Sequence, residues 1–129
     1  MALPEDHLKQ SEYWLKVAEF LEKLPERDEN KNTVIAALAI HSAIKSCDAL
    51  SLKYIGRTPS RHDQAVELFK HMVTKGLIPP EYTGLRKKLD MMIKKKSAAD
   101  YHAEFFSLND ARNFLSIARK LIELAKRLI

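Results

Sequence analysis

The sequence has few of the residues that interrupt helices or cross-link small domains. Its 129 residues include only three glycines, five prolines and one cysteine. A single cysteine excludes an internal disulfide, and the scarcity of glycine and proline leaves long stretches without a helix breaker. No apolar run reaches the ~18 residues of a membrane span, and the N-terminus lacks the basic and apolar segments of a signal peptide. We therefore expect one cytoplasmic domain over residues 1–129, with no membrane association.

The apolar residues recur at helical spacing and do not alternate as they would in a strand. The stretch from Thr33 to His62 opens with roughly 22 residues that hold no breaker, so its helix should cross the domain and carry the others. The predicted fold is all-α, an up-and-down bundle of four long helices plus a shorter fifth. The expected helices cover about 5–24, 32–54, a shorter segment between Ser60 and Gly76, 81–96, and 108–128.

Several local patterns predict how these helices begin and what they bury. Ser60 with Asp63, and Ser107 with Asp110, have the spacing of an N-cap and its partner. Cys47 lies among Ala and Ile, which favours a buried, inert thiol over a reactive one. In the first helix, helical spacing predicts a buried stripe made of Trp14, Val17, Ala18, Leu21 and Leu24.

The second helix carries a polar stripe of His41, Lys45 and Asp48, spaced four and three residues apart on one face. In one interpretation Asp48 pairs with Lys45 or orients a histidine through a ring nitrogen. In the other, the stripe faces a dimer partner or solvent. Because the small residues of this helix would let two helices approach closely, we expect a symmetric homodimer. No HxxxH or CxxC pattern occurs, so neither a metal site nor a cofactor is expected.

The net charge of +5 permits a polyanionic partner, and the basic residues gather in the last two predicted helices. Arg112, Arg119 and Lys126 repeat every seven residues. With nearby aromatic residues such as Tyr82, such a surface would bind single-stranded RNA and stack its bases. The alternative is a solvated charged face, with Tyr101, Phe105 and Phe106 closing the core. The residues assigned to nucleic-acid binding are Arg86, Lys87, Lys94, Lys95, Lys96, Tyr101 and His102.

Two stretches resemble the HEPN superfamily of small all-helical domains. One is the Ala-rich helix 41–50, followed by Ser60-Arg61-His62-Asp63 and an apolar helix. The other is 96–101, Lys-Ser-Ala-Ala-Asp-Tyr, which is similar to the Arg-x-x-Ala-Asp-Tyr stretch that many members carry before a long final helix. The similarity runs from about Val34 to Leu128 and depends on the order of the elements.

This resemblance implies a HEPN-like RNA- or nucleotide-associated domain. Many members are metal-independent ribonucleases of toxin–antitoxin, phage-defence and RNA-processing systems, and active members commonly pair as dimers. The resemblance therefore implies a defence or toxin–antitoxin type system, with weak metal-independent endoribonuclease activity as the enzymatic expectation. The alternative is a non-catalytic helical interaction domain that docks a partner such as a nucleotidyltransferase.

The signature of the catalytic members is an arginine, four to six residues, then a histidine, and Arg57 and His62 match it. In that role His62 would take the 2′-hydroxyl proton and Arg57 would hold the phosphorane charge. The competing interpretation makes His62 an ordinary first-turn residue, because so loose a motif occurs about once by chance in this chain. The family's signature usually precedes the final helices. At that place this sequence has Lys96 and His102, and lysine lacks the planar fork of arginine.

Overall fold

The structure, a computed structural model, describes residues 1–102 and 105–129, with side chains outside 98–102. Within these ranges it contains helices and no strand. The elements are α1 (Pro4–Glu22), α2 (Glu29–Tyr54), α3 (His62–Thr74), the 3-10 helix η1 (Pro80–Tyr82), α4 (Leu85–His102) and α5 (Leu108–Leu128). The predicted all-α bundle of four long helices and a shorter fifth is confirmed.

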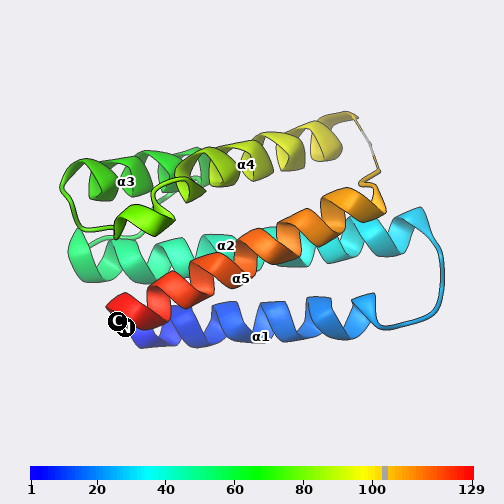
Figure 1. The fold of residues 1–129 in the computed structure, drawn as a ribbon, viewed down its shortest axis with the longest axis horizontal. Helices are drawn as coiled ribbons and strands as arrows, with labels where there is room; N and C mark the ends of the chain where they lie inside the picture. The colour runs from blue at the N-terminus through cyan, green and yellow to red at the C-terminus, as the bar shows by residue number, and fades with distance from the viewer. Residues whose placement is uncertain (103–104) are drawn as a thin grey trace.

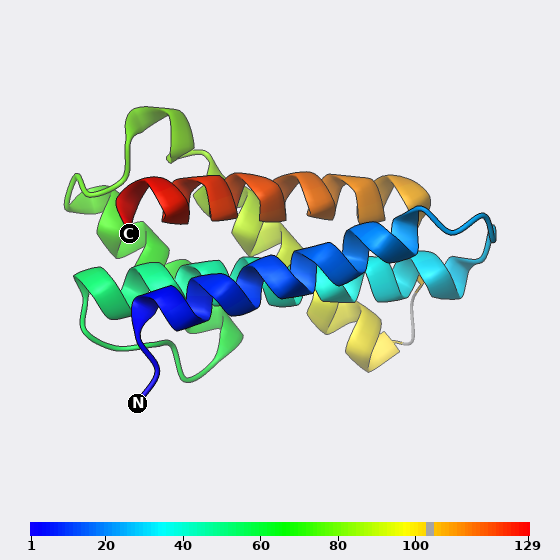
Figure 2. The same cartoon turned by 90° about the horizontal axis from the view of Figure 1, so that it is seen from below.

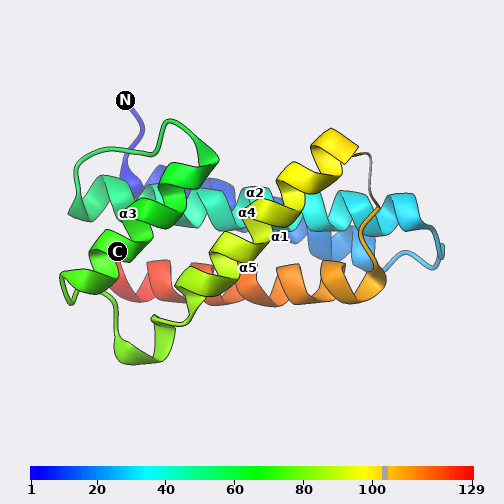
Figure 3. The same ribbon diagram turned by 90° about the horizontal axis from the view of Figure 1, so that it is seen from above.

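The bundle is built around α2, which contacts each of the other four α-helices. Figure 1 shows α1 on one side of α2 and the α3–α4 layer on the other, with α5 lying across the middle. The four long helices alternate in direction, whereas α3 is tilted and runs with α2 (Figure 3). The expectation that the others pack on this long helix is therefore confirmed.

Among the described residues, α2 alone is long and apolar enough, by length and composition, to cross a membrane. However, 61% of that apolar window is buried inside the bundle. Cys47 belongs to this buried face, and burial raises the pKa of its thiol far above the usual range. The apolarity of α2 is thus that of a core helix, and Cys47 is the inert buried thiol that its neighbours indicated.

Three buried serines join α1 to α2. The Ser11 hydroxyl lies 2.6 Å from the Ser42 carbonyl oxygen, to which it can donate, and 2.7 Å from the Ser46 hydroxyl. The Ser42 hydroxyl in turn donates to the Ser11 carbonyl at 2.9 Å. Because serine is small, the two helix axes can lie close together, and because each hydroxyl needs a partner, the pairing fixes their register.

The predicted buried stripe of α1 is wrong at two large residues. Trp14 is 38% exposed and Val17 is 53% exposed, whereas Ser11, Leu15 and Ala18 are buried against the bundle. The physical reason is the close approach of α1 and α2, which leaves room for serine and alanine but not for an indole. Figure 2 shows α1 running alongside α2. The buried face of α1 is therefore rotated away from its bulkiest side chains, which stay exposed.

Of the two predicted N-caps, one is confirmed and one is wrong. Ser107 and Asp110 form a reciprocal capping box at the start of α5. At α3 the N-cap residue is Arg61, whose side chain makes no capping bond. Ser60 bonds instead to the side-chain oxygen of Gln64, at 2.8 Å from its hydroxyl. The chain thus enters α3 one residue later than predicted, with Arg61 and not Ser60 at the boundary.

We expect Ser11→Ala to lower the free energy of unfolding by about 1–2 kcal/mol, because buried hydroxyl groups on α2 lose their partner. Urea denaturation measures this change. Ser116→Ala is the matched control, since Ser116 is exposed on α5 and its loss should change stability by less than about 0.5 kcal/mol. Equal stability of the two variants would contradict the structural role given to the serines.

Candidate functional site

A cleft of about 250 Å³ lies between the middle of α2 and the start of α3, and we call it the α2–α3 cleft. From α2 it receives the whole polar stripe, and from the α3 side it receives His62 and its neighbour Arg61. Two groups of residues that the sequence suggested separately are thereby brought together. The complete lining is His41, Ile44, Lys45, Asp48, Pro59, Ser60, Arg61, His62 and Ala65.

The path of the chain after α2 explains this meeting. The connection from residue 55 to residue 61 turns back along α2, so that α3 begins beside the middle of that helix (Figure 3). Gly56 adopts a φ of +86°, a conformation that L side chains rarely take, at the point where the chain leaves α2. Without that reversal His62 would lie beyond the end of α2, far from Asp48.

Asp48 is the half-buried acid of the cleft, and its environment is unusual. Burial raises its pKa, while the nearby positive charges of Lys45, His7 and His62 act in the opposite direction without cancelling the effect. A carboxyl group held partly out of water among basic groups is typical of functional sites. Asp48 thus interacts electrostatically with Lys45, His7 and His62, and its pairing with Lys45 or orientation of a histidine through a ring nitrogen stays a prediction.

Two supporting residues come from outside the sequence predictions. The Trp14 ring stacks on the His41 ring, with centroids 5.0 Å apart and planes inclined by 22°. The Nδ1 atom of His7 is buried and has no hydrogen-bond partner among the described residues. Neither position carries a motif, so only the packing of α1 on α2 reveals them.

Arg61 is a cation of the cleft that does not belong to the linear signature of Arg57 and His62. It lines the same cleft as His62, whereas Arg57 does not. Its guanidinium makes a 3.3 Å ion pair with Asp63, and at 71% side-chain exposure this pair is weak and open to exchange. The signal was the adjacent Arg61-His62 pair, which a search for a spaced motif does not detect.

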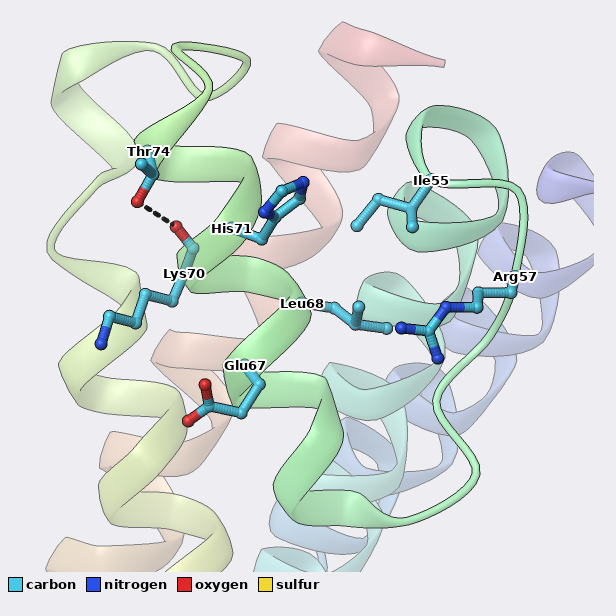
Figure 4. A pocket seen from close by; sticks show the side chains of 7 residues that line it. All are labelled: Ile55, Arg57, Glu67, Leu68, Lys70, His71 and Thr74. Carbon is cyan, nitrogen blue, oxygen red and sulfur yellow. Dashed lines mark hydrogen bonds between the residues drawn. The ribbon is translucent and has the colours of Figure 1, made fainter.

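Arg57 lines a separate groove of about 430 Å³ between the end of α2 and α3. Figure 4 shows its guanidinium extending toward Leu68 and His71 projecting from α3 toward Ile55, while Glu67 and Lys70 point away. The structure therefore brings His62 together with Arg61 and Lys45, and brings Arg57 together with His71. The catalytic pairing of Arg57 with His62 stays a prediction.

Much of the basic face predicted on α4 is engaged in ion pairs. Lys94 pairs with Asp90 at 2.9 Å, and Lys95 pairs with Asp110 at 2.7 Å. The second pair is strong enough to lower the pKa of Asp110, chiefly through the hydrogen bond from Lys95. Lys87 is exposed, while Arg86 and Lys96 are half-buried. The side chains of Tyr101 and His102 lie outside the described residues, and RNA binding by this face stays a prediction.

The basic repeat of α5 faces α1 rather than α4. Arg119 pairs with Glu19 at 3.2 Å, and Lys126 pairs with Glu12 at 3.8 Å. Since α1 and α4 lie on opposite sides of the bundle, these residues do not extend the basic face of α4 (Figure 1). Arg112 lines a hollow among acidic residues of the α1–α2 connection. The expected continuous positive surface is thus divided by ion pairs.

The aromatic residues proposed for stacking fall into two groups. Tyr82 and Phe106 are buried, and Phe106 packs edge-on against Phe114 with ring centroids 5.4 Å apart. Phe105 is exposed. Core closure is therefore the role of Phe106, which was the alternative interpretation.

Two further expectations concern the homodimer and metal binding. The small residues that motivated a homodimer, Ala36, Ala39 and Ala43, are fully buried within the chain, so the dimer stays a prediction without that support. Among the side chains of residues 1–97 and 105–129, no group of three or more His, Cys, Asp or Glu is arranged to hold a metal ion.

Comparison with protein families identifies the fold. The family model of the HEPN domain matches residues 4–128, nearly the whole chain. The protein therefore belongs to the HEPN domain family, and the resemblance noted in the sequence is confirmed. Comparisons with curated proteins and with solved structures give no significant match. Membership supports a HEPN-type function, which in this family is often that of a ribonuclease or is related to nucleotides.

We expect Asp48→Asn to leave the free energy of unfolding at pH 8 unchanged or slightly higher. The folded protein carries an acid with a raised pKa, so ionising it above that pKa costs stability that an amide does not cost. The advantage should shrink as the pH falls through the pKa of Asp48 toward about 4, because protonation removes the cost from the wild type. Urea denaturation across this pH range measures both effects.

Glu67→Gln is the matched control, since Glu67 is exposed on α3 and should show no such trend. If Asp48→Asn instead lowered the free energy of unfolding at pH 8 by more than about 1 kcal/mol, the favourable charges of Lys45, His7 and His62 would outweigh the cost of burying the carboxylate.

Proposed function

We propose that this HEPN domain binds RNA or nucleotide phosphates in the α2–α3 cleft, as part of a cytoplasmic defence or toxin–antitoxin type system. The observation that carries the proposal is the convergence of Lys45, Arg61, His41 and His62 around the half-buried Asp48. Lysine supplies a point charge for phosphate and arginine supplies a bidentate fork. The family often acts on RNA or nucleotides, which selects this class among phosphate ligands.

The chemistry of the cleft also supports metal-independent cleavage of single-stranded RNA. His62 would take the proton of a 2′-hydroxyl, whose oxygen then attacks the adjacent phosphorus. The bond from phosphorus to the 5′-oxygen of the next nucleotide breaks, and that oxygen leaves with a proton from water or from the protonated His62. Lys45 and Arg61 would hold the charge that grows on the phosphoryl oxygens. The carboxylate of Asp48 would interact with the charge that His62 gains when it takes the proton. In this proposal Arg61 takes the part that the linear signature gives to Arg57.

We expect a labelled oligouridylate to bind in low salt and to lose affinity steeply as salt rises. Lys45→Ala and Arg61→Ala should each weaken binding about tenfold, because each removes a charge-assisted hydrogen bond. Fluorescence anisotropy measures this, and Arg57→Ala is the matched control because Arg57 lies in the other groove. Unchanged affinity in both cleft variants would contradict the proposal.

Binding through α4 is distinguished in the same titration by Lys87→Glu. Lys87 is exposed, so its reversal tests the surface without breaking the pair of Lys95 with Asp110. A large loss in Lys87→Glu, with none in the cleft variants, would assign binding to the basic face of α4 and overturn the cleft proposal.

For cleavage, we expect weak activity that survives a chelator and leaves 2′,3′-cyclic phosphate ends. His62→Ala should abolish it, and Arg61→Ala or Lys45→Ala should lower it at least tenfold while Arg57→Ala retains it. Gel analysis of a labelled single strand gives the rates. Loss in Arg57→Ala with full activity in Arg61→Ala would restore the linear pairing. No cleavage by the pure protein across several strands would favour the alternative, a docking domain for a partner such as a nucleotidyltransferase.

A further inference from the structure

The outward face of α1 carries large apolar side chains that stay exposed. Tyr13, Val17 and Phe20 are 57%, 53% and 67% exposed, and Trp14 is 38% exposed. With Gln10 they form what we call the α1 outer stripe. A contiguous exposed apolar patch on a small domain is typical of an interaction site.

Four residues of the stripe surround a shallow hollow of about 220 Å³, namely Gln10, Tyr13, Trp14 and Val17. Their spacing is i, i+3, i+4 and i+7 along α1. These are the four corners that receive one side chain from a facing helix in knobs-into-holes packing. A hollow built from one helix in this way fits a second helix better than it fits a flat lipid surface.

The charged residues along the α1 outer stripe indicate which kind of partner helix it would bind. Lys9, Lys16 and Lys23 recur every seven residues along one edge of the stripe, are exposed, and form no ion pair with any described residue. Lys16 lies over the ring of Tyr13, with its Nζ atom 5.2 Å from the ring centroid. The acids Glu12 and Glu19 of α1 are already paired with α5. Glu5 and Asp6 stay exposed in the first turn of α1, so the positive charge left for a partner beside the stripe is that of Lys16 and Lys23, past this turn.

A second copy of this chain that pairs antiparallel through α1 does not fit that charge. When two identical helices pair antiparallel about a two-fold axis, the same edge of each helix meets, so Lys16 would face Lys16 and Lys9 would face Lys23. Like charges at such spacing repel. The α1 outer stripe therefore favours a partner helix that carries acidic residues along the edge facing the lysines.

We propose that the α1 outer stripe docks an amphipathic α-helix of another protein, with a large apolar side chain for the hollow and acidic residues for the lysine row. Binding an amphipathic helix by its apolar face, with flanking charges setting the partner, is a general mode of recognition. This surface is separate from the α2–α3 cleft, although Trp14 lines the hollow and stacks on His41, which lines the cleft.

Trp14 is the single tryptophan of the chain, so its fluorescence reports on the stripe directly. The probes are two tryptophan-free helical peptides with the same leucine stripe, one flanked by glutamates and the other by lysines. We expect the glutamate peptide to shift the emission saturably, and the lysine peptide to bind at least tenfold more weakly. Lys16→Glu should lower the affinity for the glutamate peptide about tenfold. Lys88→Glu, which reverses the charge of an exposed residue on α4, should not change that affinity.

The remaining outcomes overturn the proposal. Equal binding of both peptides, no binding of either, or equal effects of Lys16→Glu and Lys88→Glu would show that the stripe does not select an acidic helix. Light scattering that gives a dimer in the wild type and the 14.8 kDa monomer in Val17→Ser would assign the stripe to a second copy. Saturable binding to anionic phospholipid vesicles, with neither peptide bound, would assign it to a membrane.

Discussion

The packing of α1 on α2 through Ser11, Ser42 and Ser46 is the constraint on which the rest of the structure depends. The buried hydroxyl contacts hold α1 close to α2 and fix its rotation. That rotation sets Trp14 against His41 and sends the other bulky residues of α1 outward. The site and the exposed stripe thus follow from the same choice of small residues at one helix contact.

The α2–α3 cleft depends on a second feature, the reversal of the chain between the two helices. It places Arg61 and His62 beside Asp48, where partial burial and neighbouring charges oppose each other. A site of this kind is costly to the fold, which is why such arrangements are kept where chemistry or binding needs them. The long core helix supplies a rigid platform for one wall and the short α3 supplies the other.

The sequence was sufficient for the all-α bundle, the central role of α2, the capping box at Ser107 and the family, because these depend on periodicity and on local spacing. It was insufficient for the face that α1 buries, because Ser11, Ser42 and Ser46 look solvent-facing and find their hydrogen-bond partners only across the interface between α1 and α2. It also did not point to Arg61 as a cleft residue, since spacing along the chain does not show that residues 55–61 turn back along α2. The ion pairs that divide the basic surface were hidden for the same reason, as Glu12 and Glu19 lie about 100 residues from their partners. The catalytic pairing of Arg57 with His62 stays a prediction.

The most direct test of the central claim is an NMR titration of the histidine ring resonances with a uridine nucleotide. The account predicts that His41 and His62 shift together, because they line the α2–α3 cleft, while His71 in the Arg57 groove does not move. Shifts confined to His71, or no histidine shift at saturating nucleotide, would contradict the account.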